Sequence, residues 1–127
     1  MADVPVISII DDDESVRAAL ASLVRSLGYA ACTFAAAADF LQSARVGDTA
    51  CLIVDVQMPG MGGLDLQELL VARNSRLPTI FVTAYPEDRI RERALAGGAI
   101  GFLGKPFAAR DLIQCIDSAL LTGQRRS

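Results

Sequence analysis

Short apolar runs alternate with longer amphipathic stretches along the whole chain. Five runs rich in β-branched and apolar residues are typical of buried strands: Val4–Ile10, Ala30–Phe34, Cys51–Val54, Thr79–Val82 and Ala99–Leu103. Apolar positions spaced three and four apart predict a helix after each run, over about 16–27, 36–45, 64–71, 86–96 and 112–120. The alternation predicts a (βα)5, doubly wound α/β fold of the flavodoxin-like type, with a parallel five-stranded sheet in the order 2-1-3-4-5.

Glycine and proline mark the two ends of the fourth predicted helix. Pro86 suits the first turn of a helix, and Gly97-Gly98 should end it. The apolar face of this helix is thin, consisting mainly of Ile90, Ala94 and Leu95. We therefore expect it to be packed more loosely than the other four.

Length and composition indicate one ordinary domain. The chain has 127 residues, 52% of them hydrophobic, and we expect one domain over 1–127 with its core at about 4–121 and a short polar tail at 122–127. The net charge of -3 and a pI near 4.8 argue against nucleic-acid binding, which usually needs a basic face. There is neither an apolar run of bilayer length nor a basic leader, so we expect a cytoplasmic protein with no membrane contact.

The chain has no histidine, and its three cysteines do not have metal-ligand spacing. Without histidine, serine–histidine and cysteine–histidine nucleophiles and histidine-ligated zinc are excluded. We expect Cys32, Cys51 and Cys115 to be small buried hydrophobes in a reducing compartment. A covalent acceptor would have to be another type of residue.

Polar residues follow four of the five apolar runs. The acidic triplet 11–13 follows the first run, Asp55 the third, Thr83 the fourth and Lys105 the fifth, and Lys105 is the only lysine in the chain. The carboxyl ends of parallel strands share one edge of a sheet, where ligands bind, so these side chains should meet. Carboxylates, a hydroxyl and an ammonium are the groups of a magnesium-dependent phosphoryl-transfer site.

Each of these residues also has a purely structural explanation. Asp13 can be the N-cap of the first helix, and Asp55 can open an exposed turn. Thr83 can be a β-branched strand end, and Lys105 can be a solvated loop cation. Three adjacent acids nevertheless favour a divalent ion, because like charges repel one another without it. The proline and glycines after Asp55 would hold the carbonyl of Gln57 near the carboxylate, as a further hard oxygen ligand.

Four segments, taken in order, are similar to those of one known family. They are Ile10-Asp11-Asp12-Asp13-Glu14, Asp55-Val56-Gln57-Met58-Pro59-Gly60-Met61-Gly62-Gly63, Thr83-Ala84 and Lys105-Pro106-Phe107. They span almost the whole chain and resemble the receiver domain of bacterial two-component response regulators, in particular receivers of nitrogen-fixation regulators. The resemblance implies a non-enzymatic signalling domain that promotes its own magnesium-dependent phosphorylation and dephosphorylation.

The resemblance also implies how the acidic residues act. Asp55 would be the phosphoacceptor, supplied by a phosphohistidine on a sensor histidine kinase or a histidine phosphotransfer protein. Mg²⁺ would be bound directly by Asp12, Asp55 and the backbone carbonyl of Gln57, and by Asp11 through water. Three carboxylates bring about three negative charges, and Mg²⁺ with Lys105 brings about three positive, so the incoming phosphoryl group would meet a neutralised site.

The remaining implied roles concern the phosphorylated state. Thr83 and Lys105 would each bind a phosphoryl oxygen, and the Lys105–Pro106 peptide bond would be cis. Thr83 would move toward the phosphoryl group while Phe102 turns inward, although Phe102 can equally be an ordinary core residue. The exposed route of an attacking water would pass Gln57 and Tyr85, so both should influence the phosphoryl lifetime.

Output would come from the face formed by the fourth helix, the fifth strand and the fifth helix. Phosphorylation would bias the loosely packed fourth helix, and this face would then pair with an effector or with a second copy of the chain. Charged residues on the two helices would contribute to a homodimer: Arg89, Arg91, Arg93, Asp111 and Asp117.

Two alternatives compete with this interpretation. A phosphatase of the haloacid-dehalogenase type also uses a strand-end Asp-x-Asp pair, here Asp11 and Asp13, followed by a threonine and a lysine. It would require further acids after the lysine, and it leaves Asp55 unexplained. The other alternative is a binding module that works without phosphorylation, although each receiver position is intact.

Overall fold

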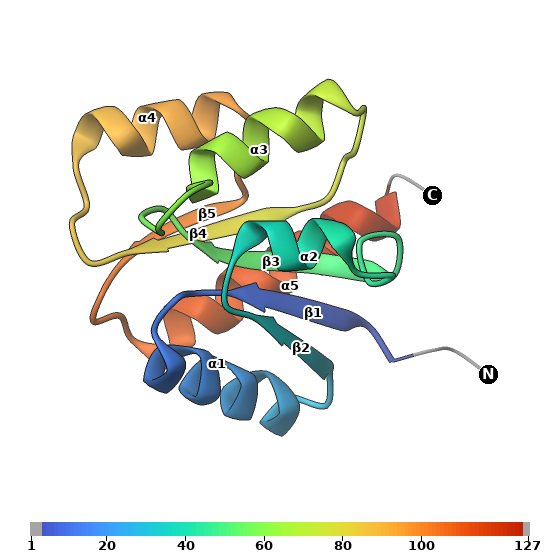
Figure 1. Cartoon of the computed structure of the whole chain (residues 1–127). Helices are drawn as coiled ribbons and strands as arrows, with labels where there is room; N and C mark the ends of the chain where they lie inside the picture. Colours follow the sequence, from blue (N-terminus) through green and yellow to red (C-terminus); the bar gives the residue numbers. More distant parts are fainter. Residues whose placement is uncertain (1–3, 126–127) are drawn as a thin grey trace.

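The computed structural model describes residues 4–125 and arranges them as a parallel sheet covered by helices on both faces (Figure 1). The strands are β1 (Val6–Ile10), β2 (Ala30–Phe34), β3 (Thr49–Asp55), β4 (Thr79–Thr83) and β5 (Gly101–Gly104). The helices are α1 (Glu14–Ser26), α2 (Ala37–Gln42), α3 (Gly63–Ala72), α4 (Asp88–Ala96) and α5 (Ala109–Arg125). The strand order is β2-β1-β3-β4-β5, with every neighbouring pair parallel, which confirms the predicted fold. Within the described residues, none of the helices is long and apolar enough to cross a membrane.

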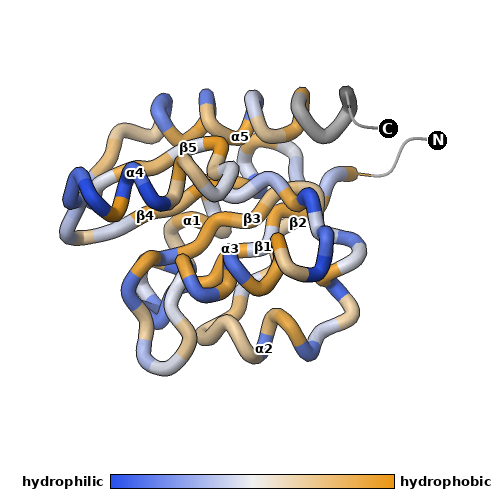
Figure 2. Tube along the Cα trace, turned by 90° about the horizontal axis from the view of Figure 1, so that it is seen from above, coloured by the Kyte–Doolittle hydropathy of each residue, from blue (hydrophilic) through white to orange (hydrophobic). Residues whose placement is uncertain are grey.

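Alternate strand residues build two separate cores. Ile53 and its neighbours on β1 and β4 face α1 and α5, whereas Leu52 and Val54 face α2, α3 and α4 on the other side of the sheet. The inner strands are accordingly hydrophobic along their length, while α4 is mostly hydrophilic (Figure 2). Cys51 is buried as expected, but Cys32 and Cys115 are partly exposed, so the prediction for these two was wrong.

The first residues of three strands differ from the sequence pattern by two positions each. β1 begins at Val6, directly after Pro5, which has no N–H to offer to a sheet. β3 begins at Thr49, earlier than predicted, because polar Thr49 still pairs with β1. β5 begins at Gly101, since the N–H of Ala99 donates to the last turn of α4.

Two helices are also shorter than the pattern predicts. α2 ends before Ser43, which adopts an extended conformation and whose hydroxyl donates to the carbonyl of Phe40. The predicted extension to Arg45 is therefore wrong. α4 begins at Asp88, so that Pro86 precedes the helix instead of lying in its first turn.

α4 packs on the rest of the molecule through few residues. Ala94 is its only buried residue, and Leu95, predicted to face inward, is 45% exposed. Two polar contacts join it to α3: the Gln67 side-chain amide donates to the Ala94 carbonyl at 2.9 Å, and Arg93 pairs with Glu68 at 2.6 Å. α4 is thus tethered to α3 by polar groups more than by apolar packing.

Candidate functional site

The ends of three neighbouring strands bring the predicted polar residues together. Asp11 follows β1, while Asp55 and Thr83 are the last residues of β3 and β4. Asp11 and Thr83 are fully buried and Asp55 is 7% exposed, although all three are polar. Burying a polar group without a hydrogen-bond partner costs free energy, so buried polar groups are normally paired. The partners of these three residues therefore define the site.

Lys105 is the partner shared by two of the carboxylates. Its Nζ lies 2.9 Å from Asp11 Oδ2 and 3.0 Å from Asp55 Oδ2. The loop that carries it is fixed to β4, because the Lys105 N–H donates to the Thr83 carbonyl at 2.7 Å. The Lys105–Pro106 bond is cis, as the sequence resemblance implies. One ammonium therefore bridges two strand ends and holds both carboxylates by ion pairs.

Asp11, Asp12 and Asp55 form a cluster suited to a hard cation. Each offers a carboxylate oxygen, and the three oxygens lie within 4.8 Å of one another. Asp12 is exposed to solvent, so the cluster is open on one side and water can complete a coordination shell. Oxygen donors and retained water fit Mg²⁺. The main-chain N–H of Gln57 donates to Asp55 Oδ1 at 3.0 Å, which places the Gln57 backbone beside this cluster.

The surroundings of Asp55 and Lys105 raise the pKa of both side chains. Burial raises the pKa of the Asp55 carboxyl, against the hydrogen bonds from Gln57 and Lys105, which act to lower it. Burial acts to lower the pKa of the Lys105 ammonium, but its hydrogen bonds to Asp11 and Asp55 outweigh burial and raise it. Lys105 therefore keeps its positive charge between the two carboxylates.

The other predicted residues lie around this centre. Asp13 is the N-cap of α1, accepting hydrogen bonds from the N–H groups of Ser15 and Val16, so it is used by the helix. The Thr83 hydroxyl accepts a hydrogen bond from the Tyr85 N–H at 3.1 Å, and this bond does not use the hydroxyl proton. Phe102 is 8% exposed and packs in the core beneath α4.

Arg17 is a site neighbour that the sequence pattern does not predict. Its guanidinium donates to the main-chain carbonyl of Asp11 at 2.8 Å. The only signal in the sequence is a basic residue one helical turn beyond the acidic triplet, and a surface ion pair would have the same spacing. A bond from a side chain to a backbone carbonyl becomes apparent only in three dimensions.

The chain matches the sequence profile of the response regulator receiver domain over residues 7–117. It is 36% identical over 121 residues to nodulation protein W of Bradyrhizobium diazoefficiens and 41% identical over 123 residues to the response regulator protein TodT of Pseudomonas putida. The chain belongs to the receiver-domain family of response regulators. The transcriptional regulatory protein FixJ of Azorhizobium caulinodans, 36% identical over 114 residues, confirms the likeness to nitrogen-fixation-type regulators.

The receiver fold is shared in full, but the relatives are longer. The structure of the response regulator StyR matches with a TM-score of 0.90 and 40% identity, covering 98% of this chain and 63% of StyR. Nodulation protein W and TodT are covered to 53% and 54%, against 95% and 96% of this chain. The receiver domain therefore spans about half the length of the curated relatives it matches.

Membership of this family decides between the predicted functions. Receiver domains are signalling domains that take a phosphoryl group from a sensor kinase onto an aspartate, and they generally bind Mg²⁺ at an acidic cluster. The phosphatase alternative is not supported. Its Asp11–Asp13 pair is also divided in the structure, since Asp11 binds Lys105 while Asp13 caps α1.

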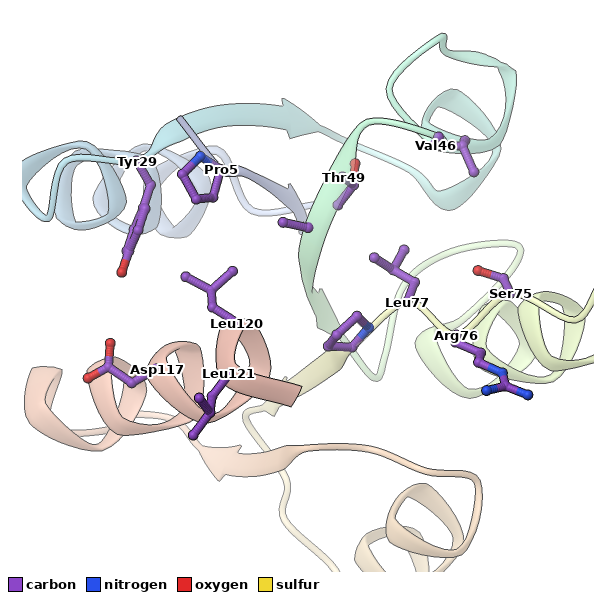
Figure 3. Close-up of a pocket in the computed structure, with 13 residues that line it drawn as sticks. Pro5, Tyr29, Val46, Thr49, Ser75, Arg76, Leu77, Asp117, Leu120 and Leu121 are labelled. Carbon is purple, nitrogen blue, oxygen red and sulfur yellow. The ribbon is translucent and has the colours of Figure 1, made fainter. Parts of the chain in front are cut away.

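A hollow of about 930 Å³ lies at the opposite end of the sheet (Figure 3). It is bordered by Tyr29, Leu77, Leu120 and Leu121, with Asp117 at its rim. It has no cluster of carboxylates and no lysine. The polar residues predicted from the sequence therefore lie at the Asp55 edge and not in this hollow.

Proposed function

We propose that Asp55 is the phosphoacceptor of this receiver domain. The observation that carries the proposal is the pairing of a 7% exposed carboxylate with Lys105, beside a second buried acid, at the strand edge where ligands bind. Among the acids of the described residues, only Asp55 ends a buried strand, pairs with the Lys105 ammonium and lies beside the carboxylate of Asp12. Asp11 pairs with the same lysine, but it is fully buried, whereas Asp55 keeps 7% exposure through which a phosphoryl donor could reach it.

The transfer step would proceed by direct displacement. A carboxylate oxygen of Asp55 attacks the phosphorus of a phosphohistidine, the P–N bond breaks, and the imidazole leaves with the bonding electron pair and is protonated by water. Lys105 then pairs with one phosphoryl oxygen, and the Thr83 hydroxyl donates its proton to another. Attack of water on phosphorus later restores the Asp55 carboxylate.

Asp12, Asp55 and the Gln57 carbonyl would hold Mg²⁺, with Asp11 contributing through water. When bound, the ion supplies positive charge for the phosphoryl oxygens. Mg²⁺ and Lys105 together offset about three carboxylate charges, so the donor is not repelled. Gln57 and Tyr85 are both exposed at the rim of the site, which supports their proposed influence on the lifetime of the acyl phosphate.

The partner would approach beside α1. A hollow of about 530 Å³ lies between α1 and the loop after β5, and it is lined by Val16, Leu20, Lys105 and Phe107 among others. An apolar surface that includes a site residue suits a protein that must bring a phosphohistidine to Asp55. Phe107→Ala should slow transfer from a phosphorylated histidine protein and leave phosphorylation by acetyl phosphate unchanged.

Output through α4, β5 and α5 remains part of the proposal. Arg89 and Arg91 are exposed on α4, and Asp111 and Asp117 are exposed on α5, so both helices present charge to a partner. Arg93 pairs with Glu68 within the chain, and its proposed contribution to a dimer would compete with this exposed ion pair. A single domain over about 4–121 and a cytoplasmic location also remain predictions.

Intact-mass measurement after incubation with Mg²⁺ and acetyl phosphate tests the assignment. One phosphate adduct should form on the wild type and none on Asp55→Asn, with Asp39→Asn as a control for loss of an exposed acid outside the site. The adduct should also disappear on addition of EDTA before the donor. An adduct of equal yield on Asp55→Asn would show that another residue is the acceptor.

A further inference from the structure

The charged guanidinium of Arg17 donates a hydrogen bond to a neutral backbone oxygen. It lies in the first turns of α1, next to the acidic triplet, yet it forms none of the ion pairs found among the described residues. Its Nη1 donates instead to the main-chain carbonyl of Asp11, at 2.8 Å in a partly buried position. This carbonyl belongs to the peptide group that joins Asp11 to Asp12.

The bond from Arg17 completes a set that immobilises Asp11. The Asp11 N–H donates to the Phe34 carbonyl at 3.2 Å, Oδ1 accepts from the Asp13 N–H at 2.9 Å, and Oδ2 accepts from Lys105. Only the main-chain carbonyl remains, and Arg17 binds it. With the carbonyl held, the peptide plane between Asp11 and Asp12 cannot rotate without breaking a charge-assisted hydrogen bond.

Asp12 has no such support of its own. Its side chain is exposed, and within residues 4–125 its carboxylate has no hydrogen-bond partner. It nevertheless lies within 4.8 Å of the carboxylate oxygens of Asp11 and Asp55. The direction of the Asp12 side chain is therefore set by the backbone on which it stands, and that backbone is held on one side by Arg17 and on the other by the cap at Asp13.

We infer that Arg17 is a positioning residue for the metal ligand Asp12, acting through the peptide group between Asp11 and Asp12. The inference rests on the proposed function, since it takes Asp12 as a Mg²⁺ ligand. Groups that orient metal ligands without touching the metal commonly contribute about 10-fold to 100-fold in metal affinity.

Removal of the Arg17 guanidinium should change the Mg²⁺ affinity in opposite directions, depending on whether Arg17 acts by positioning Asp12 or only by its charge. A positive charge near three carboxylates repels Mg²⁺, so loss of the charge alone would tighten binding. Loss of the hydrogen bond would free the peptide plane and weaken binding, because the ligand must then be ordered as the ion binds. The sign of the change in Mg²⁺ affinity therefore separates the two roles.

The experiment is a calorimetric Mg²⁺ titration of the wild type and three variants. Arg17→Met keeps the length of the side chain without donors or charge, and Arg17→Lys keeps the charge with a single compact donor. Arg25→Met is the matched control: Arg25 lies on the same helix and also donates to a backbone carbonyl, that of Ala31, but away from the acids. Hydrogen exchange at Asp12 and Asp13 in the metal-free proteins provides a second measurement that does not depend on phosphorylation.

We expect Arg17→Met to raise the Mg²⁺ dissociation constant about tenfold or more, with faster amide exchange at Asp12. Arg17→Lys should lie between the wild type and Arg17→Met, and Arg25→Met should match the wild type. Unchanged or tighter binding in Arg17→Met overturns the inference. If Arg17→Met does not fold by circular dichroism, wild-type affinity in Arg17→Lys with unchanged exchange overturns it equally. If the wild type binds no Mg²⁺, the proposed function is overturned as well. The outcomes named above for Arg17→Met and Arg17→Lys overturn only the role of Arg17 and leave the proposed function in place.

Discussion

The carboxamide of Gln67 occupies the space that a side chain on Gly97 would need. A Cβ at position 97 would lie 2.6 Å from the Gln67 carboxamide oxygen, well inside van der Waals contact. The same carboxamide donates to the Ala94 carbonyl in a buried position, so it cannot move aside without losing that bond. The glycine at the end of α4 is therefore required by its neighbour on α3, and not by its own backbone angles, since its φ is -81°.

Gly97→Ala should lower the free energy of unfolding by about 1–3 kcal/mol, the usual cost of overpacking a filled site. Gly47→Ala is the matched control, because a Cβ there meets nothing within 4 Å. Urea unfolding should also show that the penalty of Gly97→Ala largely disappears in a Gln67→Ala background, where the clashing group is gone. An equal penalty in both backgrounds would contradict the explanation.

Asp12→Ala and Asp13→Ala should separate metal binding from stability, although the residues are neighbours. Asp12 has no hydrogen-bond partner in the described part of the chain, so Asp12→Ala should change stability by less than about 0.5 kcal/mol and abolish Mg²⁺-dependent phosphorylation. Asp13→Ala removes the N-cap of α1 and should cost about 1 kcal/mol while leaving Mg²⁺ binding in place. Urea unfolding and Mg²⁺ titration measure the two effects. The reverse pattern would make Asp13 the ligand.

Asp55→Asn should stabilise the metal-free protein at neutral pH. Because the folded-state pKa of Asp55 is raised above its ordinary 3.8, the folded chain binds the proton more tightly than the unfolded chain does. Stability from this group is present below pH 3.8 and is lost as the pH rises through the folded-state pKa. Removing the charge should then raise the melting temperature at pH 7, with the gain fading toward pH 4.

Thermal unfolding in EDTA between pH 4 and pH 8 measures this gain. Asp117→Asn is the control, because Asp117 is an exposed acid in the middle of α5. The same gain in Asp117→Asn would attribute the effect to net charge. A loss of stability in Asp55→Asn at pH 7 would show that its bond to Lys105 outweighs its burial.

Lys105→Arg should fail to support the phosphorylated state even though it keeps the charge. A single Nζ atom lies within 3.0 Å of oxygens on two different carboxylates, and a planar guanidinium cannot occupy that position. Beryllium fluoride, a phosphoryl mimic, should bind the variant at least about tenfold more weakly, or about 1.4 kcal/mol. The exposed Arg110→Lys serves as the reverse control. Wild-type affinity in Lys105→Arg would make Lys105 dispensable as a phosphoryl ligand.

Beryllium fluoride with Mg²⁺ should also produce a dimer through α4, β5 and α5. Sedimentation velocity should show heavier species only with the mimic, because the phosphoryl group gives Thr83 and Lys105 a new partner and biases α4. Arg91→Glu should weaken that dimer, whereas Arg25→Glu, on the opposite face of the sheet, should not. A monomer with unchanged amide shifts from Tyr85 to Phe107 would refute both the dimer and the switch.

The fold and the position of the site could be predicted from the sequence because they rest on short-range signals. Runs such as Cys51–Val54 are apolar at every position, which is expected only of a strand buried on both faces, and the strand order then places Asp55 beside the acidic triplet. The N-cap role of Asp13 could be proposed but not decided, because capping and metal binding use the same carboxylate.

Other features depend on contacts between distant residues and left no signal in the sequence. The early end of α2 follows from the Ser43 side chain, which competes for backbone groups, and the exposure of Leu95 follows from how α4 rests on its neighbours. Arg17 donates to a backbone carbonyl, which every residue type has, so the sequence does not indicate this bond. Gln67 fills the space that a side chain at Gly97 would need, and this fit becomes apparent only in three dimensions.

The hydrogen bond between Lys105 and Asp11 joins residues 94 positions apart in the chain. During synthesis Asp11 leaves the ribosome early, and Lys105 follows only after all five strands have been translated. Until then Asp11 and Asp55 lack the ammonium with which both are paired in the folded chain. A chain that stops before Lys105 would therefore lack the cation of the Asp55 site, however much of the sheet had already formed.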